Sequence, residues 1–191
     1  MSASASAVPV AGSGHAGTAI AELISSRLRD VPDFPQAGVL FKDIVPLLAD
    51  GKAFGTVIDA LADSAAALGP VELVAGIEAR GFIIAAAIAQ RLGCGLVPIR
   101  KAGKLPPPTL RRGYTLEYGT AEIEVPQDVL TDKRVYLVDD VLATGGTVRA
   151  ALDLLAEANA QVIGVGVLLE IAFLAGRARL GGVDVQALLV V

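Results

Sequence analysis

Short apolar runs alternate with segments of helical periodicity along most of this 191-residue chain. Apolar runs of about four to eight residues are typical of strands buried on both faces, and the helical segments between them are typical of crossover connections. The alternation predicts an α/β fold, a mostly parallel sheet flanked by helices, and the length suits one domain over residues 18–191. The expected strands are residues 73–77, 95–99, 135–138 and 162–169, and the expected helices are residues 18–28, 52–68, 81–91 and 146–158.

Charge and cysteine content narrow the classes of function. The chain has a formal net charge of −4, one cysteine and one histidine. One Cys and one His cannot assemble a Cys/His zinc site. A lone Cys cannot form an internal disulfide, which fits a reducing compartment, and a cytoplasmic location is expected. The negative charge disfavours nucleic acid and membrane surfaces as partners, because both are polyanionic. Residues 1–17 lack the basic start and apolar centre of a signal peptide and are expected to form a flexible tail.

The segment Val135–Thr147, which reads VYLVDDVLATGGT, carries the strongest functional signal. A buried strand there ends in Asp139 and Asp140, and the chain then turns through Thr-Gly-Gly-Thr into a helix. Gly145 and Gly146 allow backbone N–H groups to close around a phosphate, and the start of the helix adds its positive dipole end. Paired acids at the carboxyl end of a strand suit the vicinal hydroxyl groups of a ribose. An acidic pair that only caps the helix is the alternative.

Two other segments offer cations to an anionic ligand. Residues 78–81 (Glu-Ala-Arg-Gly) follow an expected strand and open a helix, so Arg80 and nearby amides can meet an anion, although Arg80 could equally be a surface helix residue. From Arg100 to Arg112 the chain has five basic residues and no acidic one, which indicates a local anion site unless the run is an ordinary solvated loop. Residues 104–122 have no core-facing period, so they are predicted to form an irregular functional loop.

Residues 135–147 resemble the motif with which type I phosphoribosyltransferases bind 5-phosphoribosyl 1-diphosphate (PRPP). Residues 78–81 are similar to the pyrophosphate loop of that family. The resemblance implies the type I phosphoribosyltransferase fold, a mostly parallel sheet flanked by helices. Such a fold carries a small N-terminal hood, here at about residues 31–47, and a flexible lid loop, here at about residues 102–122.

The same resemblance assigns roles within a PRPP site. It implies that Asp139 and Asp140 hold the ribose 2- and 3-hydroxyl groups and that residues 143–147 hold the 5-phosphate. It also implies a cis peptide bond between Glu78 and Ala79. The residues implied in PRPP or AMP binding are Glu78, Ala79, Arg80, Gly81, Arg100, Lys101, Lys104, Tyr118, Asp139, Asp140, Ala143, Thr144, Gly145, Gly146 and Thr147.

Residues 34–44 (FPQAGVLFKDI) resemble the hood of the family members that act on adenine. The resemblance implies that Phe41 stacks on the purine, that the backbone of Leu40 and Lys42 reads its edge, and that Ile171 lies on its opposite side. A carbonyl and an N–H can match the 6-amino group and ring nitrogens of adenine, whereas an oxopurine would set acceptor against acceptor. Phe41 could instead be only a core residue.

The implied reaction transfers the 5-phosphoribosyl group from PRPP to adenine and yields AMP and pyrophosphate. The resemblance further implies Mg²⁺ bound through PRPP with no direct protein ligand, and a homodimer. Two alternatives stay open, a 6-oxopurine phosphoribosyltransferase and a non-catalytic PRPP-sensing regulator, the latter lacking any visible DNA-binding module. The residues implied in catalysis are Arg80, Lys104, Glu117, Asp139 and Asp140.

Overall fold

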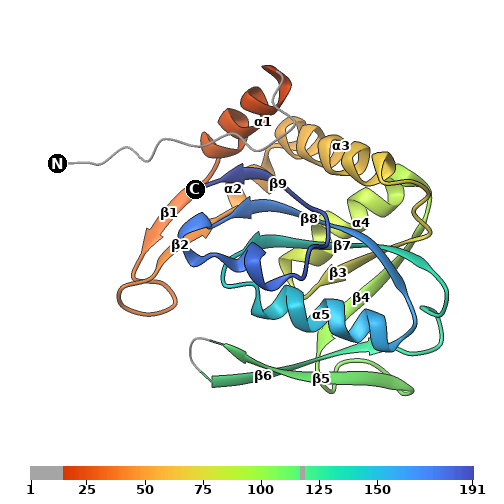
Figure 1. The fold of residues 1–191 in the computed structure, drawn as a ribbon. Coiled ribbons are helices and arrows are strands. Elements are labelled where there is room, and N and C mark those ends of the chain that lie inside the picture. The colour runs from red at the N-terminus through yellow and green to blue at the C-terminus, as the bar shows by residue number, and fades with distance from the viewer. Residues whose placement is uncertain (1–14, 117–118) are drawn as a thin grey trace.

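A seven-stranded sheet organises the computed structural model, which describes residues 15–116 and 119–191 (Figure 1). Its strands are β3 (Leu73–Ile77), β4 (Gly95–Lys101), β5 (Thr109–Leu116), β6 (Gly119–Pro126), β7 (Arg134–Leu142), β8 (Gln161–Glu170) and β9 (Val185–Val190). The strand order is β5-β6-β4-β3-β7-β8-β9, and β4, β3, β7, β8 and β9 are parallel. The hairpin of β5 and β6 adds to the edge of β4 in antiparallel fashion. The predicted α/β fold with a mostly parallel sheet is therefore confirmed.

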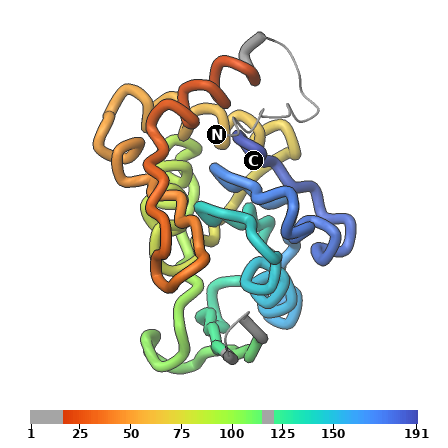
Figure 2. The backbone as a smooth tube through the Cα atoms, turned by 90° about the vertical axis from the view of Figure 1, so that its left-hand side faces the viewer, coloured from red at the N-terminus to blue at the C-terminus, as the bar shows by residue number. Residues whose placement is uncertain are grey.

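Helices cover both faces of this sheet. They are α1 (His15–Ser25), α2 (Val45–Ala49), α3 (Gly51–Ala67), α4 (Arg80–Leu92) and α5 (Gly146–Glu157), with short 3₁₀ turns η1 (Ala172–Leu174) and η2 (Gly176–Arg179). One core cluster joins α1, α3 and α4 to the sheet, and a second joins α5 to the other face, as Figure 2 shows for α4 in green and α5 in cyan. None of the helices within the described residues is long and apolar enough to span a bilayer.

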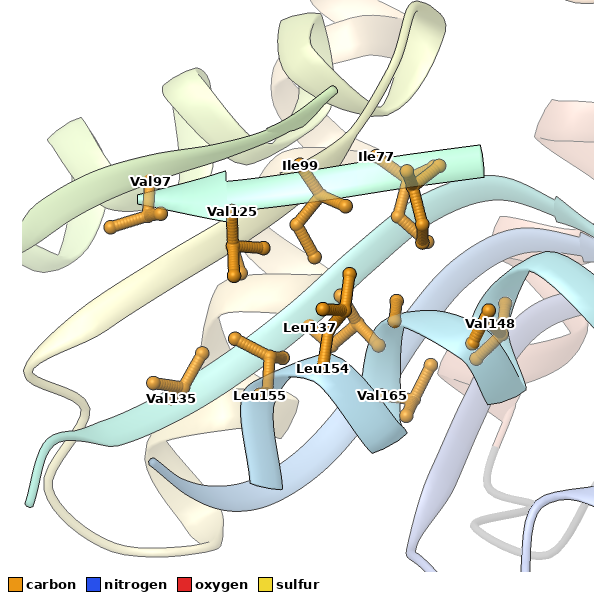
Figure 3. Packing of buried hydrophobic residues seen from close by; sticks show 14 of the residues in the cluster. Ile77, Val97, Ile99, Val125, Val135, Leu137, Val148, Leu154, Leu155 and Val165 are labelled. Carbon is orange, nitrogen blue, oxygen red and sulfur yellow. The ribbon is translucent and has the colours of Figure 1, made fainter. Parts of the chain in front are cut away.

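The packing under α5 fixes the central strands. Leu154 and Leu155 of α5 lie against Leu137 of β7, with Ile77 and Ile99 of the neighbouring strands in the same layer (Figure 3). All five side chains are at most 2% exposed. Burying a side chain of this size contributes roughly 1.5–3 kcal/mol, so these strands are held against α5 by a large apolar contact.

The chain reverses its direction of travel across the sheet between β3 and β7. These two strands pair directly, in parallel, from Leu73 opposite Val135 to Gly76 opposite Val138. From β3 the chain passes through α4 to β4 on one side, and from β7 it passes through α5 to β8 on the other. Open α/β sheets bind ligands at such a switch point, outside the carboxyl ends of the strands.

A separate hairpin lies where the hood is expected, at the left of Figure 1. Its strands, β1 (Arg29–Pro32) and β2 (Leu40–Asp43), pair antiparallel. The Nε of Arg29 donates to Asp43 Oδ2 at 3.0 Å, and Asp43 Oδ1 accepts from the backbone N–H of Val45 at 2.9 Å. Asp43 thereby ties the hairpin to the start of α2.

The prediction that residues 104–122 lack regular structure is wrong, because β5 and the first half of β6 form a regular hairpin within this range. The apolar period was absent since β5 packs on α5 partly through charge. Arg112 lies 3.6 Å from Asp153 and 3.5 Å from Glu157, both on α5. The hairpin is determined by the pairing of β6 with β4 and by the contacts of β5 with α5, rather than by local periodicity.

Three smaller boundaries also differ from the sequence predictions. Strand β9 was not expected, and β7 continues to Leu142, so the acidic pair lies inside the strand rather than at its last two positions. Helix α1 begins at His15, so residues 15–17 are helical and not part of a tail. Residues 1–14 of the expected tail lie outside the described residues.

Candidate active site

Asp139 and Asp140 form a buried acidic pair near the end of β7. Their side chains belong to residues that are only 8% and 7% exposed. The backbone N–H of Asp140 donates to Asp139 Oδ1 at 2.9 Å. Burial, and then the neighbouring charge of Asp140, raises the pKa of Asp139 well above its ordinary value. In either protonation state such a pair can hydrogen-bond a diol, because a carboxyl group accepts when ionised and also donates when protonated.

The turn after this strand forms an anion cradle at the start of α5. Gly145 caps the helix in the left-handed region, at φ +80°. The first amides of a helix lack intrahelical acceptors, and the helix dipole places partial positive charge on them. Ala143, Thr144, Gly146 and Thr147 complete this turn and are partly exposed. Backbone amides arranged in this way at the start of a helix can bind an anion such as a phosphate group.

Gly176, which lies directly against the backbone of the cradle, was not identified from the sequence. A Cβ atom on Gly176 would lie 2.1 Å from the carbonyl oxygen of Ala143 and 2.8 Å from the backbone nitrogen of Gly145. A Cβ on Gly145 would meet the Gly176 oxygen at 2.5 Å. Because 31 residues separate the two glycines in the sequence (176 − 145), no local motif announces this contact.

Gly176→Ala is expected to destabilise the protein by about 1–3 kcal/mol and to raise the KM for PRPP, because the cradle backbone must shift to admit the methyl group. Thermal unfolding and steady-state kinetics measure both effects. Gly55→Ala is the matched control, since nothing lies within 4 Å of its added Cβ and the residue is in helix α3. Unchanged stability and unchanged KM for PRPP in Gly176→Ala would contradict the role of this close approach.

The turn after β3 lies beside the acidic pair. The peptide bond between Glu78 and Ala79 is cis, as predicted. A Cβ on Gly81 would come within 3.1 Å of the Val138 oxygen and 3.2 Å of Asp139 Oδ1, so the first turn of α4 rests against β7. The structure therefore brings the two predicted anion-binding turns to one edge of the sheet.

Arg80 connects this turn to both the acidic pair and the hood. Its Nε forms an ion pair with Asp140. Its guanidinium carbon lies 4.8 Å from the centroid of the Phe41 ring. Phe34 meets the same ring edge to face at 5.1 Å and 73°. Phe41 is only half-buried and belongs to neither core cluster, so the reading of Phe41 as a core residue is disfavoured.

The remaining hood residues frame Phe41. Leu40 is 52% exposed, and Lys42 forms an ion pair with Asp30 at 2.7 Å. Ile171, expected to face the hood across the base, follows β8, and its backbone N–H donates to the Leu142 oxygen at 2.9 Å. Ile171 is therefore placed at the same sheet edge as the acidic strand.

The basic segment after β4 is tied to the turn after β3. Arg100 Nε donates to Glu78 Oε2 at 3.3 Å, and the backbone N–H of Lys101 donates to the same oxygen at 3.0 Å. Arg100 Nη1 donates to the Lys104 carbonyl at 3.1 Å. Glu117 and Tyr118 lie outside the described residues, so the structure does not place them.

The donor set at this edge fits a magnesium ion that arrives with a diphosphate. Mg²⁺ prefers oxygen ligands and is commonly held by substrate phosphates, water and one or two carboxylates. Asp139 and Asp140 supply carboxylate oxygens, whereas the described residues contain no group of three or more His, Cys, Asp or Glu side chains that could hold a metal. These residues suit an ion held mainly by the ligand.

Known proteins resemble this chain over nearly its whole length. The family described as "Phosphoribosyl transferase domain" matches residues 48–181. An adenine phosphoribosyltransferase of Frankia casuarinae is 58% identical over 174 residues, covering 91% of this chain and 92% of that protein. The crystal structure of adenine phosphoribosyltransferase from Thermoanaerobacter pseudethanolicus has a TM-score of 0.85 and 44% identity, over 89% of this chain and 99% of that chain. A Saccharomyces cerevisiae adenine phosphoribosyltransferase, complexed with an imino-altritol bisphosphate and adenine, has a TM-score of 0.84 and 33% identity, over 90% and 99%.

Proposed function

The chain belongs to the adenine phosphoribosyltransferases of the type I phosphoribosyltransferase family. These enzymes transfer the 5-phosphoribosyl group from PRPP to adenine in purine salvage, and we propose which residues of this chain bind each part of the substrates. One observation carries the proposal: Arg80, at the turn after β3, contacts both Asp140 on β7 and the ring of Phe41 in the hood. A ligand at this point meets all three groups. Relatives that act on adenine disfavour the 6-oxopurine and regulator alternatives.

We propose that PRPP is held at both ends. The turn 143–147 binds its 5-phosphate, and Asp139 and Asp140 bind the ribose 2- and 3-hydroxyl groups. Residues 78–81 and the segment after β4, including Arg100, bind its diphosphate. The side-by-side placement of β3 and β7 supports this assignment, because both turns then face one ligand.

The chemical step follows from this placement. The bond between ribose C1 and the pyrophosphate oxygen breaks as adenine N9 bonds to C1, through a transition state with positive charge on the sugar, and the proton of N9 passes to the departing pyrophosphate or to water. We assign Arg80, Lys101 and Lys104 to the negative charge that collects on pyrophosphate, and the acidic pair to the positive sugar. Bound Mg²⁺ supplies further positive charge to the diphosphate. Because no protein nucleophile is needed, positioning and electrostatics carry the catalysis.

We propose that the hood holds adenine. Phe41 stacks on one face of the base, Ile171 lies on the other, and the backbone of Leu40 and Lys42 reads the edge. The half-buried position of Phe41 beside Arg80, outside both core clusters, supports this role. We assign Glu117 and Tyr118, in the proposed lid, to the purine and PRPP sides respectively, with the lid excluding water.

We also propose a homodimer, supported by the family resemblance, and a cytoplasmic location, supported by the single cysteine. Sedimentation of the purified protein measures the first. Fractionation of the source cells measures the second.

A product assay tests the function directly. The protein is incubated with PRPP, Mg²⁺ and, in turn, adenine, hypoxanthine and guanine, and the nucleotide formed is identified by chromatography. AMP from adenine is expected, with little IMP or GMP from the oxopurines. Comparable rates with hypoxanthine, or no nucleotide from any base, would contradict the proposal.

A further inference from the structure

Glu124 of β6 is a fully buried carboxylate, with 0% of the residue exposed. Its Oε1 accepts from the backbone N–H groups of Lys104 at 2.6 Å and Leu105 at 2.7 Å. Its Oε2 accepts from Arg111 Nε at 3.0 Å and from the Thr109 hydroxyl at 3.3 Å. One carboxylate therefore joins the turn after β4 to the base of the β5–β6 hairpin.

The surroundings of Glu124 favour its charged form. Burial raises the pKa of a carboxyl group, but hydrogen bonds from the amides of Leu105, Lys104 and Gly103, with the charge of Arg111, hold the pKa of Glu124 below its ordinary value. A buried charge is costly unless it is paired and hydrogen-bonded. Two of the four hydrogen bonds to the carboxylate come from the backbone amides of Lys104 and Leu105, so the carboxylate fixes the path of the chain in the turn after β4.

Lys104 is held on both sides of its α-carbon. Its N–H donates to Glu124 Oε1, and its carbonyl accepts from Arg100 Nη1 at 3.1 Å. Arg100 stands opposite Glu124 in the pairing of β4 with β6, and it also donates to Glu78. The backbone of Lys104 is thus connected to the turn after β3 by a continuous set of polar contacts.

We propose that Glu124 is a positioning residue for PRPP, which acts by fixing the backbone of Lys104 so that the lysine ammonium meets the diphosphate. The inference rests on the proposed role of Lys104. A role of Glu124 in hairpin stability alone is the competing explanation. If Glu124 positions Lys104, its replacement lowers diphosphate affinity in a variant that remains folded. If Glu124 only stabilises the hairpin, a folded variant keeps its diphosphate affinity.

Glu124→Gln keeps the shape of the side chain and removes its charge. We expect it to weaken magnesium pyrophosphate binding, measured by calorimetry, and to raise the KM for PRPP about tenfold, because hydrogen bonds to charged groups are stronger than neutral ones. The KM for adenine should stay within about twofold. Glu122→Gln is the matched control, an exposed acid two residues earlier on the same strand, and it should leave all three values unchanged.

A double-mutant cycle with Lys104→Met separates the outcomes. If Glu124 acts through Lys104, Glu124→Gln adds no further loss of pyrophosphate affinity in the Lys104→Met background. Additive losses overturn the inference, as does unchanged affinity in Glu124→Gln when Lys104→Met alone weakens binding. Unchanged affinity in Lys104→Met overturns the proposed role of Lys104 and the inference with it.

Glu124→Asp is the second variant, to be used if Glu124→Gln fails to fold. It retains the buried charge beside Arg111 but withdraws the carboxylate from the amides of Lys104 and Leu105. The same selective loss of pyrophosphate affinity is expected, with a cooperative melting transition as evidence of folding. Wild-type affinity in folded Glu124→Asp would overturn the inference.

Discussion

Replacing Asp139 and Asp140 together with asparagine is expected to lower kcat by at least about a thousandfold, because removal of a single preorganised group at a charged transition state already costs about 10²–10³. The two carboxylates are the acidic groups that β7 brings to the switch point, beside Arg80. Asparagine has nearly the same size, so the fold should persist. Steady-state kinetics and circular dichroism measure the two effects, and near-wild-type turnover in the folded double variant would refute the assignment.

Stability measurements on Asp139→Asn provide an internal control. The raised pKa of Asp139 means that the folded protein binds a proton more tightly than the unfolded chain does. Protonated Asp139 therefore stabilises the folded protein at acidic pH, and this contribution is lost as the pH rises through the pKa of Asp139 in the folded protein. Asparagine cannot ionise, so at pH 8 the single variant should unfold at the same temperature as the wild type or a higher one. A lower melting temperature would show that the carboxylate stabilises the fold.

Local chemistry explains which parts of this molecule could be predicted from its sequence. The strand at residues 73–77 and the turn with Gly145 are specified by neighbouring residues, and both lie where expected. The fold class follows from the alternation of such segments. The cis peptide bond between Glu78 and Ala79 was predicted only from the family resemblance.

Contacts between distant segments could not be predicted. The strand β5 contains Arg111 and Arg112, which suggest a solvated loop until β6 and α5 supply their acidic partners. Glu124 looks like an exposed residue in the sequence, yet it is completely buried because turn amides 19 and 20 residues away converge on it. The same argument applies to Gly176. No side chain fits at this position, because the backbone of the turn after β7 lies directly against it.

Phe41→Ala is expected to raise the KM for adenine about 10- to 100-fold while the KM for PRPP changes little. Stacking of a base on an aromatic ring contributes about 1–3 kcal/mol, and about 1.4 kcal/mol corresponds to a factor of ten in affinity. Phe34→Ala should give a smaller rise, because Phe34 touches the ring of Phe41 edge to face. Equal changes in both KM values of Phe41→Ala would show that the base does not bind in the hood.

Discrimination between bases should survive the loss of this ring. The proposed readout of the purine edge uses the backbone of Leu40 and Lys42, and their strand β2 is held by its pairing with β1 and by Arg29 and Asp43 rather than by Phe41. Stacking is tolerant of base identity, because every base presents a π face. The ratio of kcat/KM for adenine over hypoxanthine in Phe41→Ala should therefore stay within about threefold of the wild-type ratio. A collapse of that ratio would mean that Phe41 itself selects the base, and that affinity and specificity are not separate properties of the hood.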